Sequence, residues 1–198
     1  MSLPIILDLC GGTGSWSKPY RECGRYDVRV IDPQEWLDDE ALLKAGYKRT
    51  GDVRLFEHMG REKPHGILAA PPCTHLAVSG ARWWEEKGEI ALLEALAIAD
   101  ACLRIAIVHE CKWWALENPV GRLRKYHGDP TLIFNPNEYG DPWTKRTLVW
   151  GKFKIPPRNV VEASEGSKMW KIGPGPERAR LRSATPPGWA TAFFEANP

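Results

Sequence analysis

Residues 3–16, LPIILDLCGGTGSW, decide the fold that we predict for this chain. An apolar run ends directly in a turn that carries Gly11, Gly12 and Gly14. Glycine lets the backbone of such a turn come close to a ligand. A helix that starts just after the turn offers amide groups suited to a carboxylate or a phosphate. The stretch therefore predicts an α/β protein whose first strand leads into a ligand-binding turn.

Strands and helices alternate along the rest of the chain. Strands are predicted at residues 26–32, 65–70, 112–118, 131–136 and 146–151, a short helix at 38–46, and a well-buried helix at 89–110. Short connections between them favour a doubly wound, mostly parallel sheet of the Rossmann-like type. Ligands of such sheets bind beyond the carboxyl ends of the strands. Gly11, Asp32, Cys73 and Glu117 all stand at predicted strand ends, so we expect them along one rim.

The composition changes near residue 152, which indicates three parts. Residues 1–151 form the predicted α/β core that carries the catalytic and cofactor-binding positions. Residues 152–183 are rich in proline, glycine and charge and have weak periodicity, so we expect a basic, loop-rich insert rather than a second domain. Residues 184–198 contain prolines followed by an apolar helical pattern, which predicts a C-terminal helix that returns to the core.

Charge and cysteine usage limit the partners and the compartment. Residues 1–142 carry 17 Lys and Arg against 21 Asp and Glu, whereas residues 143–182 carry 10 against 3. This basic segment favours a polyanionic partner, with a solvated face as the alternative. The five cysteines show no paired spacing, so we expect no disulfide framework, no zinc site and a reducing compartment. Without a leader or membrane-length apolar span, we expect a protein of the bacterial or phage-infected cytoplasm.

Two acidic residues follow the glycine turn at informative positions. Asp32 ends the second strand about 20 residues after the turn, where a carboxylate can accept the hydroxyl groups of a ribose. Asp52, in GDVR, is a candidate for binding the amino group of an adenine, with a capping role as the alternative. The GxGxxG spacing of dinucleotide-binding proteins is missing. The sequence therefore favours an adenosyl ligand such as S-adenosylmethionine.

Cys73 and Glu117 are the candidates for catalysis. Cys73 follows two prolines in LAAPPCTHLAVSG (68–80), beyond an apolar run rather than inside it. The prolines fix φ and preset the direction of a thiol whose thiolate is a strong nucleophile. Glu117, in ALENPVG, ends the next buried strand, where desolvation raises the pKa of a carboxyl group and lets it hold a proton. Taken alone, Glu117 is as well explained by capping, but nucleophile, acid and adenosyl pocket together favour an enzyme.

Seven motifs in this order resemble those of the DNA cytosine-5 methyltransferases: DLCGGTGSWS, ID, GDVR, APPCTHLAVSG, LENPVG, YGDPWTKRTLVWG and RSATPPGWATAFFEAN. The resemblance covers nearly the whole chain except the insert, and suggests a small, phage-like member with the Rossmann-like methyltransferase fold. It implies that Cys73 attacks carbon 6 of a cytosine flipped out of double-stranded DNA. Glu117 would protonate ring nitrogen 3, and carbon 5 would take the methyl group of S-adenosylmethionine.

Further site residues follow from the resemblance and from their positions. Lys145 and Arg146 would bind the cytosine, although lysine lacks the fork of the family's arginine. The expected donor-binding residues are Asp8, Cys10, Gly11, Gly12, Gly14, Trp16, Asp32, Asp52, Pro71, Ser183 and Ala184, with Trp16 stacking in place of the family's phenylalanine. The expected nucleic-acid contacts are His75, Ser79, Trp83, Trp143, Arg180 and Arg182. For His75 a bond to its own backbone is favoured instead, and for Trp83 core packing. No metal is expected, and a monomer is favoured.

Departures from the family pattern leave several functions open. The short insert predicts recognition of a few bases or mainly of the DNA backbone. Arg182 stands where the family has glycine and fits the acidic group of carboxy-S-adenosylmethionine, although a DNA phosphate or solvent is its favoured partner. An amino-methyltransferase is disfavoured, because its motif ends in an aromatic residue where this chain has Cys73. The sequence is also compatible with an RNA or nucleotide methyltransferase, or with a catalytically decayed DNA-binding module.

Overall fold

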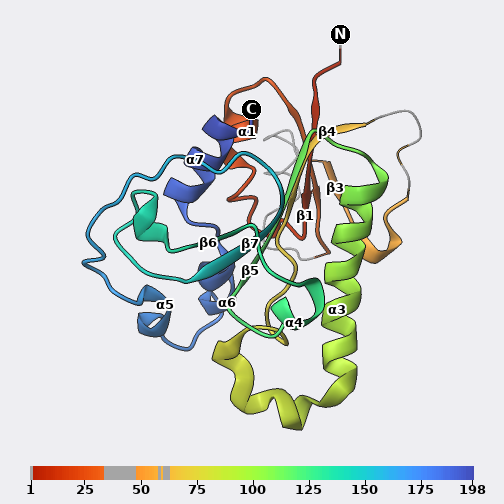
Figure 1. Cartoon of the computed structure of the whole chain (residues 1–198). Helices are drawn as coiled ribbons and strands as arrows, with labels where there is room; N and C mark the ends of the chain where they lie inside the picture. The colour runs from red at the N-terminus through yellow and green to blue at the C-terminus, as the bar shows by residue number, and fades with distance from the viewer. Residues whose placement is uncertain (1, 34–47, 58, 60–62) are drawn as a thin grey trace.

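The computed structural model describes residues 2–33, 48–57, 59 and 63–198. Within them seven strands form one sheet in the order β3-β2-β1-β4-β5-β7-β6 (Figure 1). Neighbouring strands from β3 to β5 are parallel, and β7 is antiparallel to both β5 and β6. Chain order reverses at β1, since the strands on its two sides are β2 and β4. The predicted doubly wound, mostly parallel sheet is therefore confirmed.

The elements follow the predicted order closely. The strands are β1 (Ile5–Leu9), β2 (Asp27–Ile31), β3 (Lys48–Thr50), β4 (Pro64–Ala69), β5 (Trp113–Pro119), β6 (Leu132–Phe134) and β7 (Thr147–Lys152). The helices are α1 (Lys18–Glu22), α3 (Trp84–Val108), α4 (Arg124–His127), α5 (Lys168–Lys171), α6 (Arg178–Ser183) and α7 (Pro187–Ala196). Short 3-10 segments are η1 (Val53–Leu55), η2 (Val78–Trp83) and η3 (Pro136–Glu138). β3 has no counterpart in the prediction, and the predicted helix at 38–46 lies outside the described residues.

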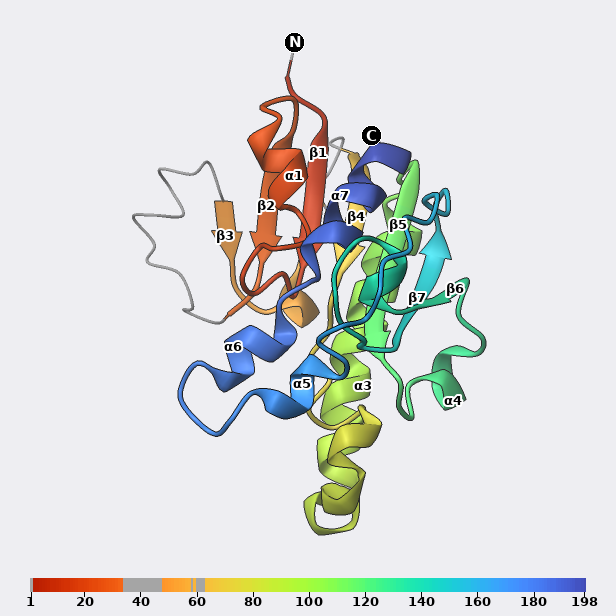
Figure 2. The ribbon, with the colours of Figure 1, turned by 90° about the vertical axis from the view of Figure 1, so that its left-hand side faces the viewer.

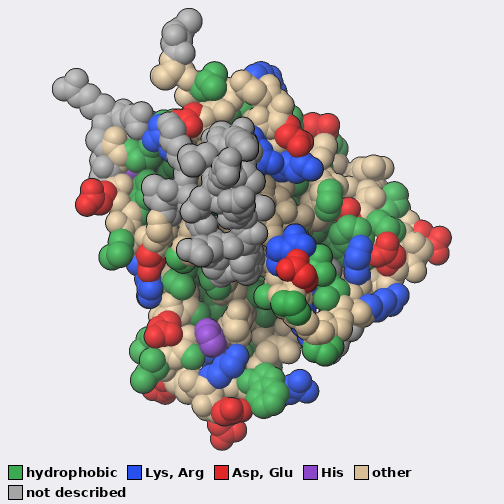
Figure 3. All heavy atoms as spheres, turned by 180° about the vertical axis from the view of Figure 1, so that it is seen from behind, with side chains coloured by type: hydrophobic (Ala, Val, Ile, Leu, Met, Phe, Trp, Pro, Cys, Tyr) green, Lys and Arg blue, Asp and Glu red, His purple; other side chains and the backbone are tan. Residues whose placement is uncertain are grey.

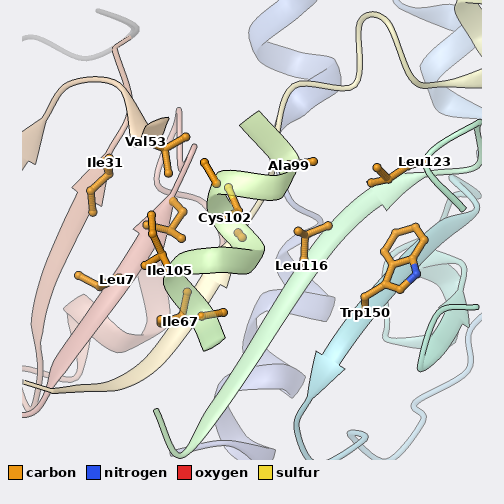
Figure 4. Close-up of a cluster of buried hydrophobic side chains, with 14 of the residues drawn as sticks. Leu7, Ile31, Val53, Ile67, Ala99, Cys102, Ile105, Leu116, Leu123 and Trp150 are labelled. Carbon is orange, nitrogen blue, oxygen red and sulfur yellow. The ribbon is translucent and has the colours of Figure 1, made fainter. Parts of the chain in front are cut away.

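The sheet separates two hydrophobic cores, because side chains alternate between its faces. On the α3 side, Leu7, Ile67 and Leu116 from three strands pack with Cys102 and Ile105 of the helix (Figure 4). α1 and α7 contact each other on the opposite face (Figure 2). The core on that side includes Ile6, Leu68, Ala115, Trp189 and Phe193. By the same alternation, Asp8 lies on the α1 and α7 face with Ile6, and Glu117 lies there with Ala115.

The long helix α3 is more exposed than the sequence predicts. It begins at Trp84 rather than at residue 89 and contains a break at Gly88, where φ is 68°. Ile90 and Leu93 are 74% and 63% exposed, so the prediction of a well-buried helix is wrong for this part of α3. The reason is geometric: one side of α3 packs on the sheet, and its first half projects beyond the sheet (Figure 1).

After β7 the chain leaves the sheet and returns through α7. Residues 153–186 contain α5, α6 and irregular backbone, and α7 is the predicted C-terminal helix, with Trp189 and Phe193 fully buried. On the rear face, Lys and Arg side chains are interspersed with Asp and Glu (Figure 3). None of the helices in the described part of the chain has the length and apolarity to cross a membrane.

Candidate functional site

Strand direction brings three distant segments to one edge of the sheet. β4 and β5 are parallel neighbours with Ala69 opposite Leu116, so the Cys73 turn and Glu117 both lie at the carboxyl edge. β7 runs antiparallel to β5, with Thr147 opposite Pro119. The residues just before β7, including Lys145, therefore reach the same edge. The antiparallel strand is what adds the basic segment to the site.

A side-chain hydrogen bond joins the segments that carry Cys73 and Glu117. Nδ2 of Asn118 donates to the carbonyl oxygen of Pro71 at 2.9 Å, and Asn118 is fully buried. The bond fixes the end of β5 against the first residue of Pro-Pro-Cys. Asn118 has no role in the prediction from sequence, although its place directly after Glu117 was a usable signal.

The loop that follows Cys73 is anchored to the segment after β5. Nε of Arg122 donates to the carbonyl oxygen of His75 at 2.8 Å, and its guanidinium lies 4.5 Å from the ring centroid of Trp84. A Cβ on Gly121 would come within 2.0 Å of the Leu76 carbonyl oxygen, so only glycine allows this approach. The segment after β5 thus holds the loop after Cys73 at two successive residues, His75 and Leu76.

Charges around Cys73 act on its thiol in opposite directions. Burial raises the pKa of Cys73, and the negative charge of Glu117 raises it further, while Lys145 and Arg182 lower it. Burial also raises the pKa of Glu117, against a lowering by Lys145. These four side chains share one electrostatic environment. The carboxyl group there holds a proton more readily than an exposed glutamate, and the two cations favour the thiolate.

The glycine turn passes directly over a buried carboxyl group. Asp8 is fully buried, and its Oδ2 accepts a 2.5 Å hydrogen bond from Oγ of Ser17. Oδ1 has no hydrogen-bond partner among the described residues. Burial raises the pKa of Asp8 to about 7. A Cβ on Gly11 would lie 2.5 Å from Cγ of Asp8, so this position requires glycine.

The turn is tied to its neighbours on both sides. Cys10, Gly12 and Gly14 all have positive φ, which produces the tight reversal, and the amide of Gly12 donates to Oδ2 of Asp32 at 2.8 Å. Sγ of Cys10 lies 3.9 Å from Sγ of Cys102 on α3. Asp32, only 6% exposed, therefore supports the turn at the end of β2, where the sequence places the ribose-binding carboxylate.

Trp16 does not have the stacking role that the sequence predicts for it. Its ring is 2% exposed and lies 5.5 Å from the ring of Phe193, centroid to centroid, in an edge-on contact. It also contacts Trp189. The prediction of a donor-stacking tryptophan is wrong, because this side chain turns into the core that α7 completes.

Asp52 has the capping role that the sequence left open. It precedes η1, and its Oδ1 accepts a hydrogen bond from the amide of Arg54 at 2.9 Å. Its carboxylate also pairs with the Arg54 guanidinium, and this interaction lowers the pKa of Asp52. Asp52 comes two residues after β3, which runs parallel to β2. Asp52 therefore lies at the carboxyl edge of the sheet, as the sequence predicts.

The predicted nucleic-acid contacts fall into two groups. Ser79 and Trp83 lie on η2 beyond Cys73, and Trp83 is 45% exposed, so the favoured core-packing role of Trp83 is wrong. Burial lowers the pKa of His75, whose Nδ1 has no hydrogen-bond partner within the described residues, so the favoured bond to its own backbone is not found.

The second group lies on the insert side. Arg180 pairs with Glu177 at 2.5 Å, and its carbonyl oxygen accepts a hydrogen bond from Oγ of Ser183 at 3.0 Å. The carbonyl oxygen of Arg182 accepts a 3.2 Å bond from Nζ of Lys145. Arg146 is exposed. Trp143, Lys145 and Ala184 line a groove of about 480 Å³ next to these residues. Lys168, which no sequence pattern singled out, lines it too.

Comparison by sequence finds no matching protein-family model and no matching curated protein. Comparison by structure finds similar chains at low identity. The structure titled Thermoplasma acidophilum 1320 has a TM-score of 0.45 and 14% identity, over 76% of this chain and 79% of that one. Phosphoethanolamine N-methyltransferase 2 of Haemonchus contortus, in complex with S-adenosyl-L-methionine, has a TM-score of 0.37 and 11% identity, over 64% of this chain. The Dnmt2 methyltransferase of S. pombe has a TM-score of 0.37 and 12% identity, over 75% of this chain. The chain spans 28% of the nematode protein and 48% of the yeast protein, and similarity this weak adds nothing about function.

Proposed function

We propose that this protein is an S-adenosylmethionine-dependent methyltransferase that modifies carbon 5 of cytosine in double-stranded DNA through a covalent bond to Cys73. One observation carries the proposal: the Asn118–Pro71 hydrogen bond, which holds the Cys73 turn beside the strand end that carries Glu117. A nucleophile and a proton-holding acid at one edge meet the two requirements of this chemistry.

Each proposed step uses a group at that edge. Carbon 5 of cytosine is a poor nucleophile until a thiolate adds to carbon 6. As the Cys73–carbon 6 bond forms, Glu117 gives its proton to nitrogen 3, and the electron pair of the ring double bond moves toward carbon 5. Carbon 5 would then form its bond to the methyl group as the bond between that methyl group and the sulfonium sulfur breaks, which leaves S-adenosylhomocysteine. Loss of the carbon 5 proton to water, return of the nitrogen 3 proton to Glu117 and departure of Cys73 as thiolate would restore the ring. The raised pKa of Glu117 supports its role as the proton donor.

The residues around the glycine turn fit an adenosyl cofactor. Oδ1 of buried Asp8 lacks a partner in the described part of the chain, and the turn over it would be blocked by any side chain at Gly11. Asp32 directly follows β2 beside this turn, where a carboxylate can accept hydrogen bonds from ribose hydroxyl groups. When bound, S-adenosylmethionine supplies an electrophilic methyl group, which must face the Cys73 turn to reach carbon 5.

A second candidate differs in the group that is transferred. The positive charge of Arg182 lowers the pKa of the Cys73 thiol, and Arg182 stands directly before Ser183 and Ala184, two of the expected donor contacts. A guanidinium there suits a donor with an additional carboxylate, carboxy-S-adenosylmethionine, which would yield 5-carboxymethylcytosine. A DNA phosphate is the alternative partner of Arg182.

Nucleoside analysis tests the proposed function. The protein is incubated with each donor and with double-stranded DNA, RNA or a cytidine nucleotide, and the products are digested and identified by mass and retention. We expect 5-methylcytosine in DNA and none with Cys73→Ala. A carboxymethyl product would favour the second candidate, and a product only in RNA or free nucleotide would change the substrate. Methylation of the amino group, or no product with any donor, would contradict the proposal.

A further inference from the structure

A groove of about 480 Å³ next to the site is lined by lysines, and two of them, Lys18 and Lys168, have no role in the proposed reaction. α1, the segment before β7, α5, α6 and the start of α7 enclose it. Lys18, Lys145 and Lys168 are its positive lining residues, and Glu22 is the negative one in the described part of the chain. Glu22 lies 3.7 Å from Lys18, and the lining residues in the described part of the chain carry three positive charges against this one negative charge. Its volume is in the range of small-ligand sites.

The groove connects the two halves of the site. Its lining includes Ser15, the residue directly after Gly14 of the glycine turn. Its lining also includes Lys145, whose charge lowers the pKa of both Cys73 and Glu117. The groove therefore lies next to the glycine turn and next to the basic segment that precedes β7.

Lys168 is held at the groove wall. Its Nζ lies 4.0 Å from the ring centroid of Trp143 and 3.1 Å from a carboxylate oxygen of Glu165. An ammonium group over an aromatic face is stabilised there. The Nε1 atom of Trp143 is buried without a hydrogen-bond partner among the described residues. Lys168 of the insert therefore lines the groove with its ammonium group held between Trp143 and Glu165.

We propose that this groove binds the carboxylate at the amino-acid end of the donor and that Lys168 is the residue that selects for it. The proposal rests on the proposed function. The sulfonium of S-adenosylmethionine carries three substituents: the adenosyl group, the methyl group and the amino-acid arm. With the ribose at Asp32 and the methyl group toward Cys73, the third arm leaves past Ser15, where the groove begins. The carboxylate on that arm is the donor's one negative group, and the lysines meet it there.

Calorimetric titration of the full chain without nucleic acid tests this assignment. The two ligands are S-adenosylmethionine and decarboxylated S-adenosylmethionine, which differ by the carboxylate alone. We expect wild type to prefer the first by about tenfold, the usual effect of one charge-assisted hydrogen bond. Lys168→Met should remove this preference by weakening S-adenosylmethionine only. Lys168→Arg should restore much of it.

Lys171→Met is the matched control. Lys171 is on the same helix, and its Nζ donates to the carbonyl oxygen of Glu165 rather than lining the groove. This variant should bind both donors as wild type does. Unchanged S-adenosylmethionine affinity in Lys168→Met would overturn the proposal, and so would an equal loss for both donors or no preference in wild type. The proposed function is judged separately, by the nucleoside product, which depends on Cys73 and is measured at saturating donor.

Discussion

The side-chain amide of Asn118 and the carbonyl oxygen of Pro71 lie 2.9 Å apart and join the ends of two neighbouring parallel strands. Asn118 follows the proposed acid, Glu117, and Pro71 begins the turn that carries the proposed nucleophile, Cys73. Neither reacting side chain makes this bond. The side chain of Asn118 therefore helps to set the relative position of Cys73 and Glu117, and it can be substituted without changing either of them.

Asn118→Ala should impair product formation far more than donor binding. The variant leaves the buried Pro71 carbonyl unpaired, at a cost of about 1–3 kcal/mol in the free energy of unfolding. The glycine turn that follows β1 makes no part of this bond, whereas Pro71 is itself an expected donor contact, so a small loss of donor affinity should accompany the larger loss of product. Denaturant unfolding, donor titration and product assays measure the three effects. Asn137→Ala is the control, because Nδ2 of Asn137 makes the same kind of bond to the Val161 carbonyl oxygen outside the site. Equal losses in donor affinity and product rate for Asn118→Ala would contradict this role.

Alkylation of the Cys73 thiol should show the opposing charges around it. The negative charge of Glu117 raises the pKa of Cys73, and Lys145 lowers it. Glu117→Gln should therefore move the pH midpoint of alkylation down, and Lys145→Met should move it up. Iodoacetamide rates across pH, with peptide mapping to isolate Cys73 from the other four cysteines, give both midpoints. Shifts in the same direction would refute the shared environment.

Asp8 should make the folded protein less stable as pH rises from about 4 to 7. Burial raises its pKa from 3.8 to about 7, so the folded state keeps a proton that the unfolded chain has lost. Folding then becomes less favourable with increasing pH in this window, by at most about 4 kcal/mol. Asp8→Asn cannot ionise and should lack this contribution. Position 8 is uncharged in both folded proteins near pH 4, so wild type should lose stability relative to Asp8→Asn as pH rises to 7. Unfolding free energies measured across the window should therefore diverge, and a constant difference between them would count against it.

Gly11→Ala should abolish donor binding or destabilise the fold. The added Cβ would come within 2.5 Å of the buried Asp8 carboxyl group, so the turn must move. Gly173→Ala is the matched control, because a Cβ there meets nothing within 4 Å. Donor titration and thermal unfolding of both variants compare them directly. Wild-type donor affinity and stability in Gly11→Ala would show that the turn does not pass over Asp8 as described.

Local patterns were enough to predict most of the sheet. Apolar runs bounded by glycine, proline and charge located six of its strands, and the Gly11–Gly14 turn fixed the position of the first. α3 was misjudged because its apolar residues are spread around the helix, and the pattern alone does not reveal that the first half extends past the sheet. The fold does not explain why an apolar residue, Ile90, stands at this exposed position.

Sequence patterns located residues whose position depends on their near neighbours in the chain. They missed residues whose surroundings come from distant segments. The common edge of Cys73 and Glu117 was predicted because each stands at a strand end beside a distinctive neighbour. Trp16 was misassigned because its surroundings come from α7, at the far end of the chain. Lys168 was overlooked for the same reason: only folding brings the insert against Ser15.

Covalent trapping tests the central claim most directly. Double-stranded DNA that contains 5-fluorocytosine is incubated with the protein and S-adenosylmethionine, then analysed by denaturing electrophoresis and peptide mapping. Fluorine at carbon 5 cannot leave as a proton does, so the bond from carbon 6 to Cys73 should persist in wild type and be absent in Cys73→Ala. A wild-type protein that binds donor but forms no such adduct, or an adduct that survives in Cys73→Ala, would contradict the account.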